Sequence, residues 1–88
     1  MIPDDLPESA RILIVDSEAN RAAAAVVFPT YHVVYPGHEL HLLGRKERRE
    51  LAGRHVTIWP TAGERAQAQA EACAAVVHGH ASAIRIVR

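Results

Sequence analysis

The sequence predicts a small α/β domain in which four short strands alternate with helices. The chain has 88 residues, a length that makes one domain. Four runs rich in β-branched or other apolar residues have the length of strands: residues 11–16, 31–35, 55–59 and 83–87. Segments with helical character separate these runs. The order βαβαβαβ therefore predicts a three-layer αβα domain around a four-stranded, mainly parallel sheet.

The first strand and helix have clear signals. Residues 11–16 include an unbroken apolar run, which is typical of a strand buried on both faces. Ser17 can cap a helix over residues 18–28, with apolar positions at Ala22, Ala23, Val26 and Val27. After the second strand, the chain is polar and basic, and we expect a loop and a short helix over about residues 45–51.

The third strand, residues 55–59, is followed by Pro60 and a long helix over about residues 62–78. Thr61 and Glu64 have the spacing of a capping box, in which a threonine and a glutamate satisfy the first backbone N–H groups of a helix. Small side chains lie along one face of this helix and allow it to approach a sheet closely: Ala66, Ala70, Cys73, Ala74 and Val77. Residues 1–10 hold two prolines and three acids and predict a tail or edge segment before the domain at 11–88.

The composition indicates the cellular environment of the chain, but it does not identify a partner. Ten basic and ten acidic residues give a formal net charge of zero, so net charge points to no partner. Cys73 is the one cysteine, so no disulfide can form within the chain, and a reducing cytoplasm is expected. The first residues do not have the pattern of a signal peptide, and no apolar run has the length of a membrane span.

Ligands of open parallel sheets bind at the carboxyl ends of the strands. Three such ends carry polar residues, in the segments 15–18, 35–38 and 59–64. A flavodoxin-like strand order, 2-1-3-4, would bring the first and third of these ends together.

The residues at these ends resemble a TOPRIM domain, the metal-dependent module of primases and topoisomerases, in the form found in phage and mobile-element primases and helicases. The resemblance covers residues 11–88 and rests on Val15-Asp16-Ser17-Glu18-Ala19, Tyr35-Pro36-Gly37-His38, Leu51-Ala52-Gly53-Arg54 and Ile58-Trp59-Pro60-Thr61-Ala62-Gly63-Glu64-Arg65. It implies a TOPRIM-like fold and a magnesium site at the ends of the first and third strands.

The chain departs from the family pattern at the metal ligands. Asp16 stands where the family has a glutamate, and Thr61 and Gly63 stand where it has two aspartates. Magnesium prefers carboxylate oxygens, and two-metal phosphoryl transfer needs several of them. We therefore expect no catalytic residues and no cofactor. Asp16, Glu18 and Glu64 form a residual acidic site, and Asp16 with Glu18 could hold Mg²⁺ weakly. Ser17 or Asp16 capping the first helix is the alternative explanation.

A basic segment is the candidate contact for phosphate or a partner. It contains Arg45, Lys46, Arg48 and Arg49, with Arg54 nearby, although Glu47 and Glu50 interrupt it. A solvated helix face is the alternative. Six histidines, among them the pairs His38/His41 and His78/His80, predict scattered surface residues rather than a zinc site. Trp59 is expected to pack beside the sheet.

These observations predict a catalytically inactive TOPRIM-like binding module. A small phage or mobile-element accessory protein would fit, one that binds or inhibits a nucleic-acid-processing complex, such as a host defence complex. Two alternatives stay open. One is a divergent Mg²⁺-dependent nuclease or primase-type phosphoryl-transfer domain using Asp16, Glu18 and Glu64, and the other is a structural module that forms a homodimer through an edge strand.

Overall fold

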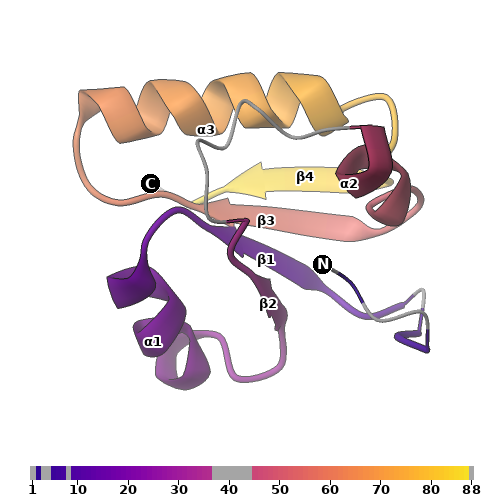
Figure 1. The fold of residues 1–88 in the computed structure, drawn as a ribbon, viewed down its shortest axis with the longest axis horizontal. Coiled ribbons are helices and arrows are strands. Elements are labelled where there is room, and N and C mark those ends of the chain that lie inside the picture. The colour runs from indigo at the N-terminus through magenta and orange to yellow at the C-terminus, as the bar shows by residue number, and fades with distance from the viewer. Residues whose placement is uncertain (1, 3–4, 8, 37–44, 88) are drawn as a thin grey trace.

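Four parallel strands form one sheet in the order β2-β1-β3-β4 (Figure 1). The structure is a computed structural model, and it describes residues 2, 5–7, 9–36 and 45–87. The strands are β1 (Ile12–Val15), β2 (His32–Val34), β3 (His55–Trp59) and β4 (Ala83–Ile86). The predicted α/β class and the alternation of strands and helices are confirmed, and every strand pair is parallel.

The central position of β1 explains its unbroken apolar sequence. All four of its residues are fully buried, because β2 and β3 flank it and helices cover both faces. β2 lies at one edge and has only three residues, so Tyr31 and Tyr35, which the sequence analysis includes in this strand, lie just outside it.

Helix α1 (Glu18–Val27) begins where the sequence predicts. Ser17 is its N-cap, and the Ser17 hydroxyl accepts a hydrogen bond from the Asn20 backbone N–H at 3.1 Å. The predicted apolar face is wrong, because Val26 is 82% exposed and Val27 is 55% exposed. Ala24 is the buried residue of this helix instead. Asn20, one turn before Ala24 on the same side of the helix, donates a side-chain hydrogen bond to β3.

Helix α3 (Glu64–Val77) buries its small residues Ala70, Cys73 and Val77 against the sheet, as predicted. The predicted capping box is wrong. Gly63 is the N-cap, no side chain caps the helix, and Thr61 donates its hydroxyl hydrogen to Asp16 instead. A third, short helix, α2 (Arg45–Glu50), precedes β3 and agrees with the expected helix at about 45–51.

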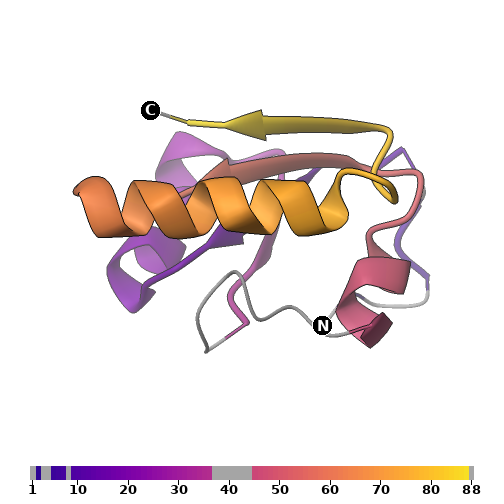
Figure 2. The same ribbon diagram turned by 90° about the horizontal axis from the view of Figure 1, so that it is seen from above.

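The core has two parts, one on each face of the sheet. Helices α3 and α1 lie on opposite faces of the sheet (Figures 1 and 2). On one face, α3 and the residue after α2, Leu51, cover Ile12, Ile14, Val56 and Ile58. On the other face, α1 covers the side chains that alternate with these, and the smaller cluster there comprises Leu13, Val15 and Ala24, with Phe28, Tyr31, Val33, Tyr35 and Trp59 packed against it. This alternation places helices on both faces of the sheet.

The described part of the segment before β1 packs against the domain. Ile2 belongs to the larger core cluster, and its backbone N–H donates a hydrogen bond to a Glu50 carboxylate oxygen at 3.1 Å. Leu6 packs against the same cluster. Within the described residues, no helix is both long enough and apolar enough to cross a membrane.

Candidate functional site

The carboxyl ends of β1 and β3 lie side by side. Val15 and Trp59 are register partners in neighbouring parallel strands, so the residues that follow them leave the sheet together. The strand order β2-β1-β3-β4 brings together Asp16, after β1, and Thr61, after β3, as the 2-1-3-4 arrangement implies. We call this place the carboxyl edge.

At the carboxyl edge, Thr61 donates hydrogen bonds to both oxygens of the Asp16 carboxylate. The Thr61 backbone N–H lies 3.0 Å from Asp16 Oδ1 and 2.9 Å from Asp16 Oδ2. The Thr61 hydroxyl donates a further hydrogen bond to Asp16 Oδ1. Charge-assisted bonds of this kind are among the stronger ones in proteins, and here they join the ends of two strands that are 45 residues apart in sequence.

The other two acids of the predicted site are exposed residues in the first turns of helices. Glu18 begins α1, and its Oε1 accepts a hydrogen bond from Arg21 Nη1 at 3.2 Å. Glu64 begins α3. Both positions favour a carboxylate because the amino end of a helix is partially positive.

A depression of about 520 Å³, with both polar and apolar residues in its lining, lies beside the Asp16–Thr61 contact. Its lining includes Asn20, Trp59, Thr61, Gly63 and Gln67. The Asn20 side-chain amide donates a hydrogen bond to the Trp59 carbonyl oxygen at 3.1 Å, and Gln67 Nε2 is buried with no hydrogen-bond partner among the described residues. Sequence reasoning missed Asn20 and Gln67, because an asparagine or glutamine within a helix carries no signal of a contact with a distant strand end.

Asn20 and Thr61 act in the same way on the fold. Thr61 joins the end of β3 to the β1–α1 connection, and Asn20 joins it to the first turn of α1, each through a hydrogen bond. The carboxyl edge therefore offers amide and hydroxyl groups around one carboxylate, and that carboxylate already has internal partners.

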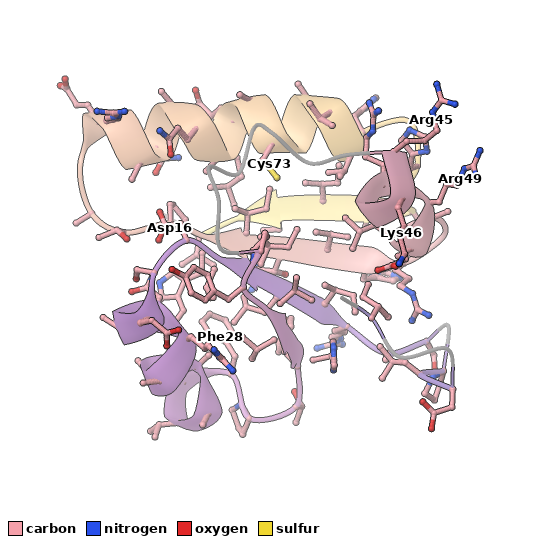
Figure 3. All side chains as sticks on the ribbon, in the orientation of Figure 1. Asp16, Phe28, Arg45, Lys46, Arg49 and Cys73 are labelled. Carbon is pink, nitrogen blue, oxygen red and sulfur yellow. The ribbon has the colours of Figure 1, made fainter. Side chains whose placement is uncertain are left out.

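The basic residues of α2 lie at the opposite end of the sheet from Asp16 (Figure 3). Helix α2 leads through a short turn into the first residue of β3, so it stands at the amino ends of the strands. Arg45, Lys46 and Arg49 are exposed, whereas Arg48 is half-buried and its Nε has no hydrogen-bond partner among the described residues. The predicted acidic site and the predicted basic contact are therefore separate surfaces.

Arg54 differs from the other basic residues, because it is only 9% exposed. Its guanidinium donates three hydrogen bonds to backbone carbonyl oxygens: from Nε to Glu50 at 3.1 Å, from Nη1 to Pro7 at 2.7 Å, and from Nη2 to Leu6 at 3.2 Å. Arg54 thus fastens the segment before β1 to the end of α2. The candidate contact surface is the exposed part of α2, without Arg54.

The remaining candidate residues have structural surroundings. Trp59 packs against Phe28, with ring centroids 5.1 Å apart, and belongs to the cluster on the α1 face, as predicted. Cys73 is fully buried beneath α3, and this burial raises the pKa of its thiol from 9.0 to about 11. His78 and His80 are exposed near the end of α3. His38 and His41, and with them the Gly37–His38 part of the family pattern, lie outside the described residues.

Comparisons with family models, with curated proteins and with solved structures gave no match to this chain. The resemblance to TOPRIM domains thus depends on the sequence motifs quoted above.

Proposed function

We propose that this protein is a catalytically inactive, TOPRIM-like binding module that works as a small accessory protein. Its partner would be a nucleic-acid-processing complex, of the kind that phages and mobile elements meet or carry, and the module would bind or inhibit that complex. The observation that supports this proposal is the use of Asp16 within the fold, where both carboxylate oxygens accept hydrogen bonds from Thr61.

A phosphoryl-transfer site would need the opposite arrangement. Magnesium is held by several carboxylate oxygens in near-octahedral geometry, and these must be free to face the ion. A Mg²⁺ ion at Asp16 would have to replace the Thr61 N–H and hydroxyl as partners of the carboxylate. Thr61 and Gly63 supply no carboxylate of their own, so the carboxyl edge favours a role in holding the strand ends together.

The exposed cations of α2 supply the binding part of the proposal. Arg45, Lys46 and Arg49 extend from one short helix at the amino ends of the strands (Figure 3). Arginine and lysine attract the phosphate backbone of nucleic acid and acidic protein surfaces. A complex that holds nucleic acid presents both.

The first experiment tests the loss of catalysis. Supercoiled plasmid and a single-stranded oligonucleotide are incubated with the protein and Mg²⁺ or Mn²⁺, and metal binding is followed by titration calorimetry. We expect neither nicking nor cleavage from the natural sequence or from Asp16→Asn. Metal-dependent cleavage that is lost in Asp16→Asn would overturn the proposal in favour of a divergent nuclease.

The second experiment tests binding. Tagged protein is used to capture partners from a bacterial lysate, with and without nuclease treatment, beside a variant that carries Arg45→Glu, Lys46→Glu and Arg49→Glu. We expect the natural sequence to retain a nucleic-acid-processing protein that the variant loses, while circular dichroism shows that both are folded. Equal recovery by both proteins, or no recovery by either, would contradict the proposed role of α2.

Homodimerisation is a second candidate, favoured by the position of β4. This strand ends the sheet, so its outer edge has no strand partner among the described residues. An apolar groove of about 680 Å³ runs beside it, lined by Ala74, Ala75, His78, Ile84 and Ile86. Light scattering over a wide concentration range would show twice the mass of one chain if a second copy pairs there, and the mass of one chain if none does.

A further inference from the structure

One half of the sheet face on the α1 side carries no helix among the described elements. Helix α1 packs over β1 and β2, whereas α3 covers β3 and β4 from the opposite face. A depression of about 310 Å³ lies on this open half. It is distinct from the carboxyl edge and from α2, and none of its side chains belongs to the proposed function.

The register of the sheet places the polar lining of this depression in two adjacent rows. Thr57 of β3 is the partner of Arg85 of β4, and both lie on the face that Leu13 occupies in β1. Two residues earlier, on the same face, come Arg11 before β1 and His55 at the start of β3. Arg11 and Arg85 therefore stand on either side of His55 and Thr57.

The spacing lets both arginines reach one ligand. Arg11 and Arg85 are two strands apart and offset by two residues, which separates their Cα atoms by about 12 Å. Two extended arginine side chains can meet across such a distance. Both residues are exposed, whereas Thr57 is only 6% exposed and forms the floor between them.

The charged side chains that line the depression are basic. Two guanidinium groups and an imidazole line it, and none of the described residues that line it is acidic. The Arg11 guanidinium carbon lies 5.9 Å from the centre of the Tyr31 ring, a cation–π contact that holds this group at the rim. The Tyr31 ring is itself held by an edge contact with Phe28, with centroids 5.3 Å apart. These contacts hold the Arg11 guanidinium at the rim before any ligand arrives.

We propose that this depression binds the phosphate group of a nucleotide or of a single-stranded nucleic acid. Arginine presents several N–H donors in a planar fork, and two arginines on opposite sides can contact different oxygens of one phosphate. The Thr57 hydroxyl can donate a hydrogen bond to the phosphate oxygen that lies deepest in the depression. The Arg11 guanidinium lies over the Tyr31 ring, and a base can stack on the outer plane of this guanidinium, so a nucleotide phosphate suits the site better than an isolated inorganic anion.

This inference goes beyond the proposed function, because the depression would bind phosphate whether or not the carboxyl edge has lost catalysis. It also uses none of the cations of α2. The test below can therefore fail while the experiments on Asp16 and α2 succeed, and the reverse also holds.

The experiment is a titration of isotope-labelled protein followed by the NMR shifts of its backbone amides. The probes are inorganic phosphate, adenosine monophosphate and a short oligothymidylate. We expect saturable shifts centred on Arg11, His55, Thr57 and Arg85, with tighter binding of the nucleotide probes than of phosphate. The oligonucleotide will bind more tightly than the mononucleotide if the natural ligand is a nucleic acid, and no more tightly if it is a small nucleotide.

Charge-matched variants decide whether the depression is the site. Arg85→Gln should weaken binding of the preferred probe by about tenfold, since one charge-assisted contact is lost. Arg11→Gln should give a similar loss. Arg21→Gln removes the same charge from the exposed surface of α1 and should leave the affinity unchanged. Equal affinity of all four proteins, shifts confined to α2 or to the carboxyl edge, or no shifts with any probe would overturn the proposal.

Discussion

Replacement of Arg54 by alanine tests whether this residue holds the fold together or is available to a partner. The side chain is buried, and all three of its nitrogens donate to backbone carbonyl oxygens. Hydrogen bonds from a charged donor contribute about 1.5–3 kcal/mol each, and those made by one side chain are not additive. One carbonyl, that of Pro7, keeps a partner because it also accepts the Ala10 backbone N–H at 3.0 Å. We expect Arg54→Ala to lower the free energy of unfolding by about 2–4 kcal/mol.

That loss is large for a chain of this size, whose total stability is of the order of 4–13 kcal/mol. Urea unfolding followed by Trp59 fluorescence measures it, and at a slope of about 1 kcal/mol per molar urea the midpoint should fall by about 2–4 M. Proteolysis should also cleave the segment before β1 more quickly in the variant. Arg54→Lys keeps the positive charge but loses the planar, several-donor guanidinium group. Its free energy of unfolding should therefore lie between those of the natural sequence and Arg54→Ala.

Arg49→Ala is the matched control, because Arg49 is an exposed arginine of α2. Arg49→Ala should change the free energy of unfolding by no more than about 0.5 kcal/mol. If Arg54→Ala cost no more than Arg49→Ala, the three hydrogen bonds would contribute nothing measurable. The guanidinium would then be free to act with the other cations of the basic segment.

Three further substitutions follow from the described contacts. The raised pKa of Cys73 predicts a thiol that stays protonated and reacts slowly with Ellman's reagent until urea unfolds the chain. Its contribution to stability should be complete below pH 9 and be lost as the pH rises from 9 toward 11, a dependence that Cys73→Ala should remove. Ser17→Ala should cost about 1 kcal/mol in urea unfolding through the lost N-cap, whereas Ser82→Ala, in an exposed turn, should cost less than half of that. Gly63→Ala should lower the thermal midpoint and reduce the free energy of unfolding by about 1–3 kcal/mol, because φ is +123° at this position. Gly79→Ala should leave the thermal midpoint unchanged, because Gly79 has equal open space around it and no such φ.

The sequence predicted the elements whose signals are local. The run from Ile12 to Val15 is apolar at every position because both faces of a central strand are covered, and its sequence shows this directly. The small residues of α3 follow helical spacing, and the structure buries three residues of the predicted face, Ala70, Cys73 and Val77. Ser17 caps α1 through a contact with a residue three positions away.

The errors have a common physical cause, which is a distant partner that competes with a local pattern. Thr61 fits a capping box, but Asp16, which is 45 residues away, takes its hydroxyl hydrogen. Arg54 follows a run of exposed cations in the sequence, yet it is buried and donates hydrogen bonds to carbonyl groups 47 and 48 residues away. The side of α1 that faces the sheet carries Asn20, whose side chain bonds to Trp59, 39 residues away. None of these partners can be found from spacing alone.

The central place of β1 also has a consequence for folding during synthesis. Its partner strands begin 20 and 44 residues later in register, at His32 and Val56. As the chain emerges from the ribosome, the apolar segment Ile12–Val15 leaves before the other three strands, and its second partner, β3, follows only 44 residues later. Long-range parallel pairing of this kind is slow, and an exposed apolar strand attracts other chains. Slower translation between β1 and β3 should therefore lengthen the period in which this chain depends on chaperones.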